Sequence, residues 1–234
     1  MTDDSAAAGA TVDTDFTGQD LSEVFATSDG AARVFRRCDF TDAGLSRTDL
    51  RGATFEACTF DGATLTRAEL DGSVWKGGSA AKANFSGADV SDAVFDGVDL
   101  ANTTWRGAMI ADASFTGCRL VGARFDEARG LGPKFRRCNL MLASLAGISL
   151  RGQELDGLRM DDAVLAGADL RDTVWRDSRL RGALLRAADL HGADVRGADL
   201  GDVLLEEAHL FAGAVISAEQ AAAILGQLGI VVDG

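Results

Sequence analysis

Large apolar residues occur at every fifth position between residues 33 and 217, and this period restricts the possible folds more than any other feature of the chain. The series runs from Phe35 to Val215 without a change of phase, and only Ala80 and Gly130 lack a large side chain. A period of five fits neither the 3.6-residue repeat of an α-helix nor the two-residue repeat of a strand. The chain is therefore predicted to be a coiled repeat in which stacked units share one core.

A slower period of twenty residues sets the size of each coil. Four five-residue units form one coil, with a turn at each corner and hydrogen bonds from coil to coil. The pattern predicts an all-β fold, a parallel solenoid of about nine coils and roughly 43 Å, in which the rings of Phe95 and Phe115 stack directly. The aromatic residues that carry the twenty-residue period are Phe35, Phe55, Trp75, Phe95, Phe115, Phe135 and, further along, Trp175.

Two irregular segments, residues 77–82 and 128–133, interrupt the repeat without changing its phase. The first places Ala80, and the second Gly130, where a large side chain belongs. Each segment is expected to loosen one corner or to bend the axis. Leu131 is expected to turn inward and fill the space that Gly130 leaves.

The region before the repeat is expected to cap it. Residues 1–14 are predicted to be a flexible acidic segment, since the chain before the repeat contains seven acidic side chains and no Lys or Arg. Phe16 and Leu21 are five residues apart but one residue out of phase with Phe25. Residues 15–32 are therefore predicted to form an irregular capping coil over the first apolar layer.

Residues 33–216 are assigned to the solenoid, and residues 217–234 to a C-terminal helix and dimerisation tail. Ser217 and Gln220 form a capping box, which predicts the start of a short α-helix. The apolar residues that follow are more than the end of a monomer normally leaves in water. They either cover the last coil or are buried against a second copy, tail to tail, and both uses can coexist. The candidate dimer interface consists of Ile224, Leu225, Leu228, Ile230 and Val232.

The net charge of −13 is too small for the whole shaft to imitate DNA. B-DNA carries about one charge per 1.7 Å, so a shaft of this length would need on the order of 25 negative charges. Within the repeat, the acids concentrate on one side. They are either ordinary solvated residues or a column that imitates a row of phosphates for a DNA-binding groove. The candidate partner-binding acidic face consists of Glu69, Asp71, Asp89, Asp92, Asp112, Asp169, Asp172 and Asp189.

The sequence offers no constellation for catalysis. The acids recur by period and do not converge, and no nucleophile has a histidine placed to activate it, so neither an enzyme nor a bound cofactor or metal is predicted. The four cysteines occupy inward-facing positions that alanine usually fills, and they are expected to be reduced core residues. The chain shows neither a signal peptide nor a membrane-spanning pattern, so a cytoplasmic protein without direct membrane or nucleic-acid binding is expected.

Ala-Asp-Leu units recur in the second half of the repeat, at residues 168–170, 188–190 and 198–200. They resemble the A(D/N)LXX signature of the pentapeptide-repeat family, and the resemblance extends over most of the chain. Membership of this family implies a right-handed quadrilateral β-helix. It does not by itself imply a function, because one fold hosts many functions.

The F-x-x-C-x-[FL] units that begin at Phe35, Phe55, Phe115 and Phe135, together with the apolar tail, look like the fluoroquinolone-resistance branch of that family, the Qnr and MfpA types. This resemblance implies a C-terminal homodimer that binds DNA gyrase or topoisomerase IV, partly as a DNA mimic. It further implies that the protein protects its partner from topoisomerase-poisoning antibiotics. A passive scaffold that presents ladders of side chains to an unrelated protein is the alternative.

Overall fold

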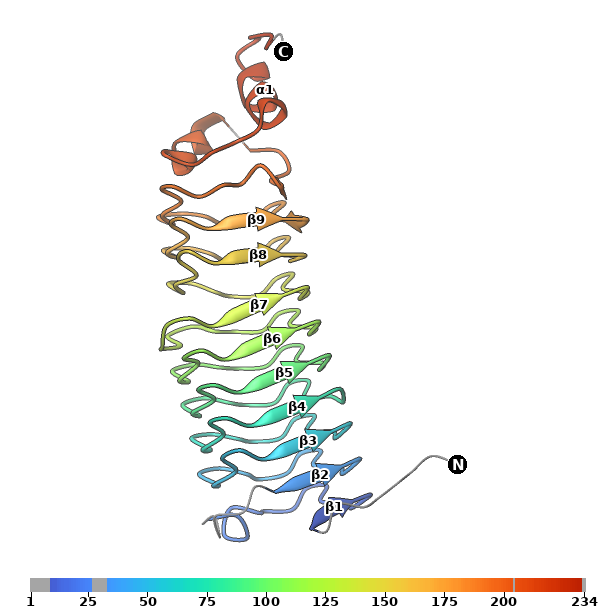
Figure 1. Cartoon of the computed structure of the whole chain (residues 1–234). Coiled ribbons are helices and arrows are strands. Elements are labelled where there is room, and N and C mark those ends of the chain that lie inside the picture. Colours follow the sequence, from blue (N-terminus) through green and yellow to red (C-terminus); the bar gives the residue numbers. More distant parts are fainter. Residues whose placement is uncertain (1–8, 27–32, 204, 233–234) are drawn as a thin grey trace.

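Nine parallel strands, β1 to β9, stack as one sheet along a side of an elongated rod (Figure 1). The computed structural model describes residues 9–26, 33–203 and 205–232, so the predictions for the remaining residues lie outside the described chain. A shorter sheet pairs β10, Ser178–Arg179, with β11, Ala198–Asp199. The strands of the main sheet are β1 Ala10–Val12, β2 Val34–Arg36, β3 Thr54–Glu56, β4 Val74–Lys76, β5 Val94–Asp96, β6 Ser114–Thr116, β7 Lys134–Arg136, β8 Glu154–Asp156 and β9 Val174–Arg176. The predicted all-β parallel solenoid is confirmed.

Successive coils are aligned with an offset of twenty residues, so four five-residue units form each coil as predicted. Phe95 lies opposite Phe115 in the strand register, and their rings stack with centroids 4.9 Å apart and planes 6° from parallel. A second column of stacked rings runs from Phe85 through Trp105 to Phe125. The plane of Trp105 lies at 86° to that of Phe115. The two columns therefore meet edge to face, a favourable aromatic arrangement, inside one continuous core.

A left-handed backbone conformation turns the chain at each corner. From Arg37 to Gly192, the residue two positions after each fifth-position residue has a positive φ. Many of these corner residues are glycine, which adopts this conformation without steric cost. Leu142 is a costly exception, because its φ is 59° and its side chain is 60% exposed. For such a residue the left-handed conformation costs roughly 1–2 kcal/mol.

Replacing Leu142 with glycine is expected to raise the free energy of unfolding by about 1 kcal/mol, because the strain at this corner is relieved while little buried contact is lost. Urea unfolding measures the change. Gly147, at the next corner, supplies the reverse substitution: its φ is 72° and an added Cβ would meet nothing within 4 Å. Gly147→Ala should therefore destabilise the protein through φ alone. A Leu142→Gly variant less stable than the wild type would contradict the strain argument.

The N-terminal coil is more regular than predicted. Strand β1 begins at Ala10, inside the segment predicted to be flexible, and Ala10 lies opposite Val34 in β2. This offset is 24 residues instead of the usual twenty, which explains why the early apolar residues are out of phase. The ring of Phe16 stacks on Phe40 with centroids 4.8 Å apart, and Leu21 is buried. The coil therefore continues the core and does not merely cover it.

Of the two irregular segments, only the second disturbs the core pattern. Ala80 is fully buried, but Leu131 is 75% exposed, so the prediction that it turns inward is wrong. Its carbonyl still accepts a hydrogen bond from the Asp112 nitrogen at 2.9 Å, which fixes Leu131 in an outward-facing position of the repeat. Gly130 also lies close to the preceding coil, because an added Cβ would be 2.6 Å from the Ala111 nitrogen.

The ladder is interrupted just after this segment. Strands β7 and β8 pair only through Arg136 and Asp156, whereas β6–β7 and β8–β9 each pair over three residues. The carbonyl of Pro133 accepts a hydrogen bond from Gln153 Nε2 at 2.9 Å, so a side chain replaces a backbone rung. Figure 1 shows the arrow of β8 tilted relative to that of β7. The loosening that the sequence predicts at an irregular segment is therefore found between β7 and β8.

The regular five-residue phase ends at Val203, although pairing between coils resumes at Val215, which lies opposite Asp194. The 3₁₀-helix η1, Leu205–Phe211, follows, and the repeat shifts by one residue. Phe211 is buried while Val215 is 47% exposed, so the predicted continuation of the phase to Val215 is wrong. Among the described residues, none between Gly201 and Gly213 has a positive φ. The turns that would keep the five-residue phase are therefore missing.

Helix α1, Ala218–Gly226, closes the C-terminal end of the rod (Figure 1). The predicted capping box is confirmed: the Gln220 nitrogen donates to Ser217 Oγ at 3.1 Å, and the Ser217 nitrogen donates to Gln220 Oε1 at 2.7 Å. These bonds satisfy backbone donors of the first helical turn.

Candidate partner-binding surface and C-terminal groove

The predicted acidic residues lie along one side of the solenoid. Isolated bridges place Glu69 beside Asp89 and Asp169 beside Asp189 in successive coils. The structure therefore brings these side chains into register, as the twenty-residue period implies. Their ion pairs, however, divide them into two groups.

Arginines neutralise the acids toward the C-terminal end of this side. Arg171 donates two hydrogen bonds of 2.8 Å to the carboxylate of Asp169 and lies 3.5 Å from Asp189. The hydrogen bonds from Arg171 lower the pKa of Asp169 to about 2. Arg151 lies 3.2 Å from Asp172. These predicted site residues therefore present much less charge to a partner than the sequence suggests.

The N-terminal end of the same side is neutralised in the same way. Arg51 donates hydrogen bonds of 2.9 and 2.7 Å to the two carboxylate oxygens of Asp49. Its Nε also lies 3.4 Å from Glu69, one coil further along. Arg51 therefore partly neutralises the carboxylate of Glu69, although the Glu69 side chain remains exposed.

Four aspartates in the middle of this side have no ion-pair partner in the described chain, although one of them, Asp71, lies within Coulombic range of Arg51. Within the described chain, the carboxylate of Asp89 accepts hydrogen bonds only from the nitrogen and hydroxyl of Ser91, at 2.9 and 2.6 Å. Asp92 and Asp112 occupy exposed corners with positive φ. We call this set, Asp71, Asp89, Asp92 and Asp112, the acidic column.

The predicted dimer-interface residues are divided between two environments. Ile224 is 8% exposed and packs within its own chain, so this residue covers the last coil. Leu225 is half-buried. Leu228 is 56% exposed and Ile230 is 48% exposed, and Val232 is exposed as well. The last three therefore remain available to a second copy.

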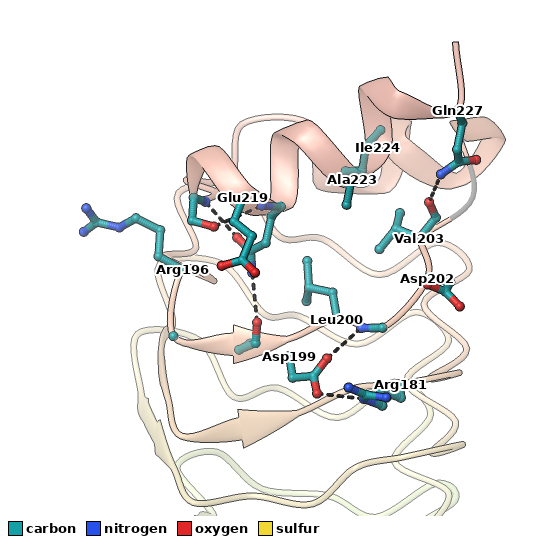
Figure 2. Close-up of a pocket in the computed structure, with 15 residues that line it drawn as sticks. Arg181, Arg196, Asp199, Leu200, Asp202, Val203, Glu219, Ala223, Ile224 and Gln227 are labelled. Carbon is teal, nitrogen blue, oxygen red and sulfur yellow. Dashed lines mark hydrogen bonds and ion pairs between the residues drawn. The ribbon is translucent and has the colours of Figure 1, made fainter. Parts of the chain in front are cut away.

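A groove of about 810 Å³ lies between α1 and the last coil (Figure 2). Leu200, Val203, Ala223 and Ile224 supply apolar lining, and charged side chains including Arg181 form its rim. Sequence reasoning missed this groove. The sequence signals the groove only through two glutamines, Gln220 in α1 and Gln227 directly after it. Helix-capping rules account for Gln220 but not for Gln227.

Metal, redox and membrane roles each require a particular structural feature. Within residues 9–26, 33–203 and 205–232 no group of three His, Cys, Asp or Glu side chains converges as metal ligands. The four cysteines are free and buried as predicted, and burial raises the pKa of the Cys58 thiol to about 11. No helix in the described chain is long and apolar enough to cross a bilayer.

The fold defines a class, the parallel β-solenoid with four five-residue sides to each coil. The chain belongs to the pentapeptide-repeat family. The family model described as a pentapeptide repeat region matches residues 33–105, and the model described as pentapeptide repeats in eight copies matches residues 91–126, 108–147 and 163–202. No curated protein sequence matches the chain.

Several solved structures are similar to this chain. A trypsin-treated form of QnrB1, described as a plasmid-mediated fluoroquinolone resistance protein, is 21% identical, with a TM-score of 0.60 and coverage of 95% of this chain and 99% of that one. A second trypsin-treated form is 20% identical, with a TM-score of 0.53 and coverage of 97% and 100%. HetL from Nostoc sp. strain PCC 7120, described as involved in heterocyst differentiation regulation, is 22% identical, with a TM-score of 0.45 and coverage of 81% and 86%.

Proposed function

We propose that this chain is a cytoplasmic, non-enzymatic protein that binds DNA gyrase, or the related topoisomerase IV, and protects it from antibiotics that trap the cleaved DNA complex. The observation that carries the proposal is the acidic column, a row of carboxylates without ion-pair partners in the described chain, along one side of the solenoid. The likeness to QnrB1, described as a fluoroquinolone resistance protein, supports the same function.

The acidic column imitates DNA only in part. Successive coils are about 4.8 Å apart, so its carboxylates form a row of negative charge that follows the rod axis. A groove built for duplex DNA is lined with cations, and charge complementarity raises the rate of docking. The arginine-paired acids at the two ends contribute little, because exposed ion pairs are already neutral at short range. We therefore assign the main electrostatic contact to the middle coils.

Changing all four aspartates of the acidic column to asparagine is expected to weaken gyrase binding at least about tenfold and to flatten its dependence on salt, because fewer charges are screened. The fold should persist, since asparagine keeps the hydrogen-bond acceptor and tolerates positive φ. Binding to purified gyrase at several salt concentrations, and supercoiling with and without a fluoroquinolone, measure both effects.

A matched control removes the same charge from other sides of the rod. Its four aspartates also have no ion pair with a described residue, and they are Asp42, Asp61, Asp96 and Asp162. This variant should bind gyrase almost as the wild type does. An equal loss of gyrase affinity in both variants would mean that binding depends on the net charge of the protein and not on one docking side. A wild-type protein that neither binds gyrase nor alters supercoiling would favour the scaffold function.

We further propose that two copies join through their C-terminal tails. Replacing Leu228 and Ile230 with glutamate is expected to give a folded monomer of 24.4 kDa by light scattering, because both side chains are exposed in the single chain and become charged at the interface. The control replaces Leu142 and Leu184 with glutamate. These two side chains lie elsewhere on the shaft and are 60% and 58% exposed. That variant should remain a dimer. Persistence of the dimer in the tail variant would place the interface elsewhere.

A further inference from the structure

Two glutamine side chains of the C-terminal cap take the place of missing backbone rungs. Two coils before the last one, the carbonyl of Leu158 accepts a hydrogen bond from the nitrogen of Arg179 at 2.8 Å. At the equivalent position of the last coil, the Ala198 carbonyl accepts instead from Gln220 Nε2, also at 2.8 Å. Gln227 Nε2 reaches the Val203 carbonyl at 2.6 Å. The cap therefore satisfies acceptors at both ends of this strand edge.

The donors between these two glutamines are not satisfied. One coil earlier, the nitrogen of Leu180 donates to the Asp199 carbonyl at 2.8 Å, and two coils earlier the nitrogen of Asp162 donates to the Arg181 carbonyl at 2.9 Å. In the last coil the corresponding N–H groups of Leu200 and Asp202 donate to no group in the described chain. Leu200 is buried, and a buried backbone donor is rarely left without an acceptor, whereas Asp202 is exposed.

Both residues line the groove beneath α1. Figure 2 shows the two residues on the last coil, with Ala223 and Ile224 of α1 across the groove from them. The groove thus combines an open strand edge with an apolar wall. This combination is the recognition mode of β-strand addition, in which backbone hydrogen bonds supply affinity and pockets take alternate side chains.

We propose that this groove receives residues 230–232, which follow the turn at the end of α1, from a second copy of the chain, as an added strand whose carbonyls accept from Leu200 and Asp202. The tail is β-branched at three successive positions, which favours an extended strand. Val231 is 88% exposed in its own chain. Figure 1 shows the tail leaving α1 on the side away from the coils, so its own groove is not within its path. The proposal rests on the C-terminal dimer and adds that the two tails exchange.

Disulfide trapping between two variants tests the exchange. One variant carries Ala223→Cys, in the groove, and the other carries Ile230→Cys, in the tail. Ala223 is exposed in the single chain, and the native cysteines are buried. Mixing the two full-length variants under mild oxidation is expected to give a covalent dimer on non-reducing electrophoresis, because an exchanged tail brings the two sites within disulfide range. Neither variant alone should give it.

A groove-filling substitution supplies the second arm. Ala223→Trp should raise the dimer dissociation constant at least about tenfold, since the indole occupies the space of the added strand. Simple apolar packing of the tails would be unchanged or strengthened by the same tryptophan. Covalent dimers from Ile230→Cys alone, or an unaffected Ala223→Trp dimer, would overturn the exchange while leaving the proposed dimer intact. A monomeric wild type would overturn both the exchange and the proposed dimer. Gyrase binding is measured in a separate experiment.

Discussion

Replacing Leu165 with aspartate is expected to destabilise the shaft by several kcal/mol and to unfold the neighbouring coils. Leu165 is fully buried in the column of inward-facing side chains, and its neighbours there offer no cation or hydrogen-bond donor. A buried, unpaired carboxylate either remains charged at high cost or is protonated with a raised pKa. In a solenoid each coil is stabilised mainly by its neighbours, so the damage should spread along the rod. Circular dichroism and urea unfolding measure the loss.

The adjacent residue provides the control. Val164 is half-buried and lies in the outward-facing position of the same unit. Val164→Asp places the same charge one residue away, on the side of the backbone that faces water. It should change the free energy of unfolding by less than about 1 kcal/mol. Similar losses for the two variants would contradict the inward and outward assignment on which the fold rests.

Trp105→Ala is expected to lower the free energy of unfolding by about 3–5 kcal/mol, the range for large aromatic residues truncated in a core. Trp105 is fully buried, and its ring stacks on Phe85 with centroids 4.2 Å apart and on Phe125 at 5.5 Å. Its indole nitrogen donates to Thr103 Oγ1 at 2.8 Å. The truncation therefore removes a stacked ring from the middle of a column and leaves a cavity. Chemical denaturation of the purified variant measures the change.

A conservative variant separates the stack from the hydrogen bond. Trp105→Phe keeps a ring between Phe85 and Phe125 but removes the N–H donor. Thr103 Oγ1 still donates to the Leu100 carbonyl at 2.7 Å, so its proton remains satisfied. The phenylalanine variant should lose roughly 1–2 kcal/mol, much less than the alanine variant. Equal losses would mean that the polar contact, and not the stacked ring, stabilises this layer.

The two sequence periods were sufficient to predict the solenoid, its four-unit coil and the stack of Phe95 on Phe115, because a repeat places every equivalent residue in the same environment. The predictions were wrong where the chain leaves the repeat. Leu131 was assigned an inward role from composition, but backbone register holds it outward. Val215 was assigned to the core, but η1 adds a residue and places Phe211 there instead.

The candidate site was only partly predictable for a different reason. Position in the repeat shows which side carries the acids, but it does not show where a long arginine side chain turns. Arg171 lies two residues from Asp169, and only the structure shows the paired hydrogen bonds that neutralise that carboxylate. The groove depends on where α1 stops relative to the last coil. Helix capping rules locate the start of α1 but not the side-chain reach of Gln227 across to Val203.

The interrupted ladder between β7 and β8 weakens the rod on one side, while bonds such as that from the Leu140 nitrogen to the Arg159 carbonyl continue across the junction on another. Coils in a solenoid support each other through nearest-neighbour contacts, so the weakest junction is where one part opens while the other stays folded. The acidic column lies entirely on the N-terminal side of this junction, and helix α1 with its groove lies on the C-terminal side. Fraying or proteolysis that begins at the C-terminal end is therefore expected to stop at β7. The acidic column would then survive on a folded fragment that lacks the proposed dimer interface.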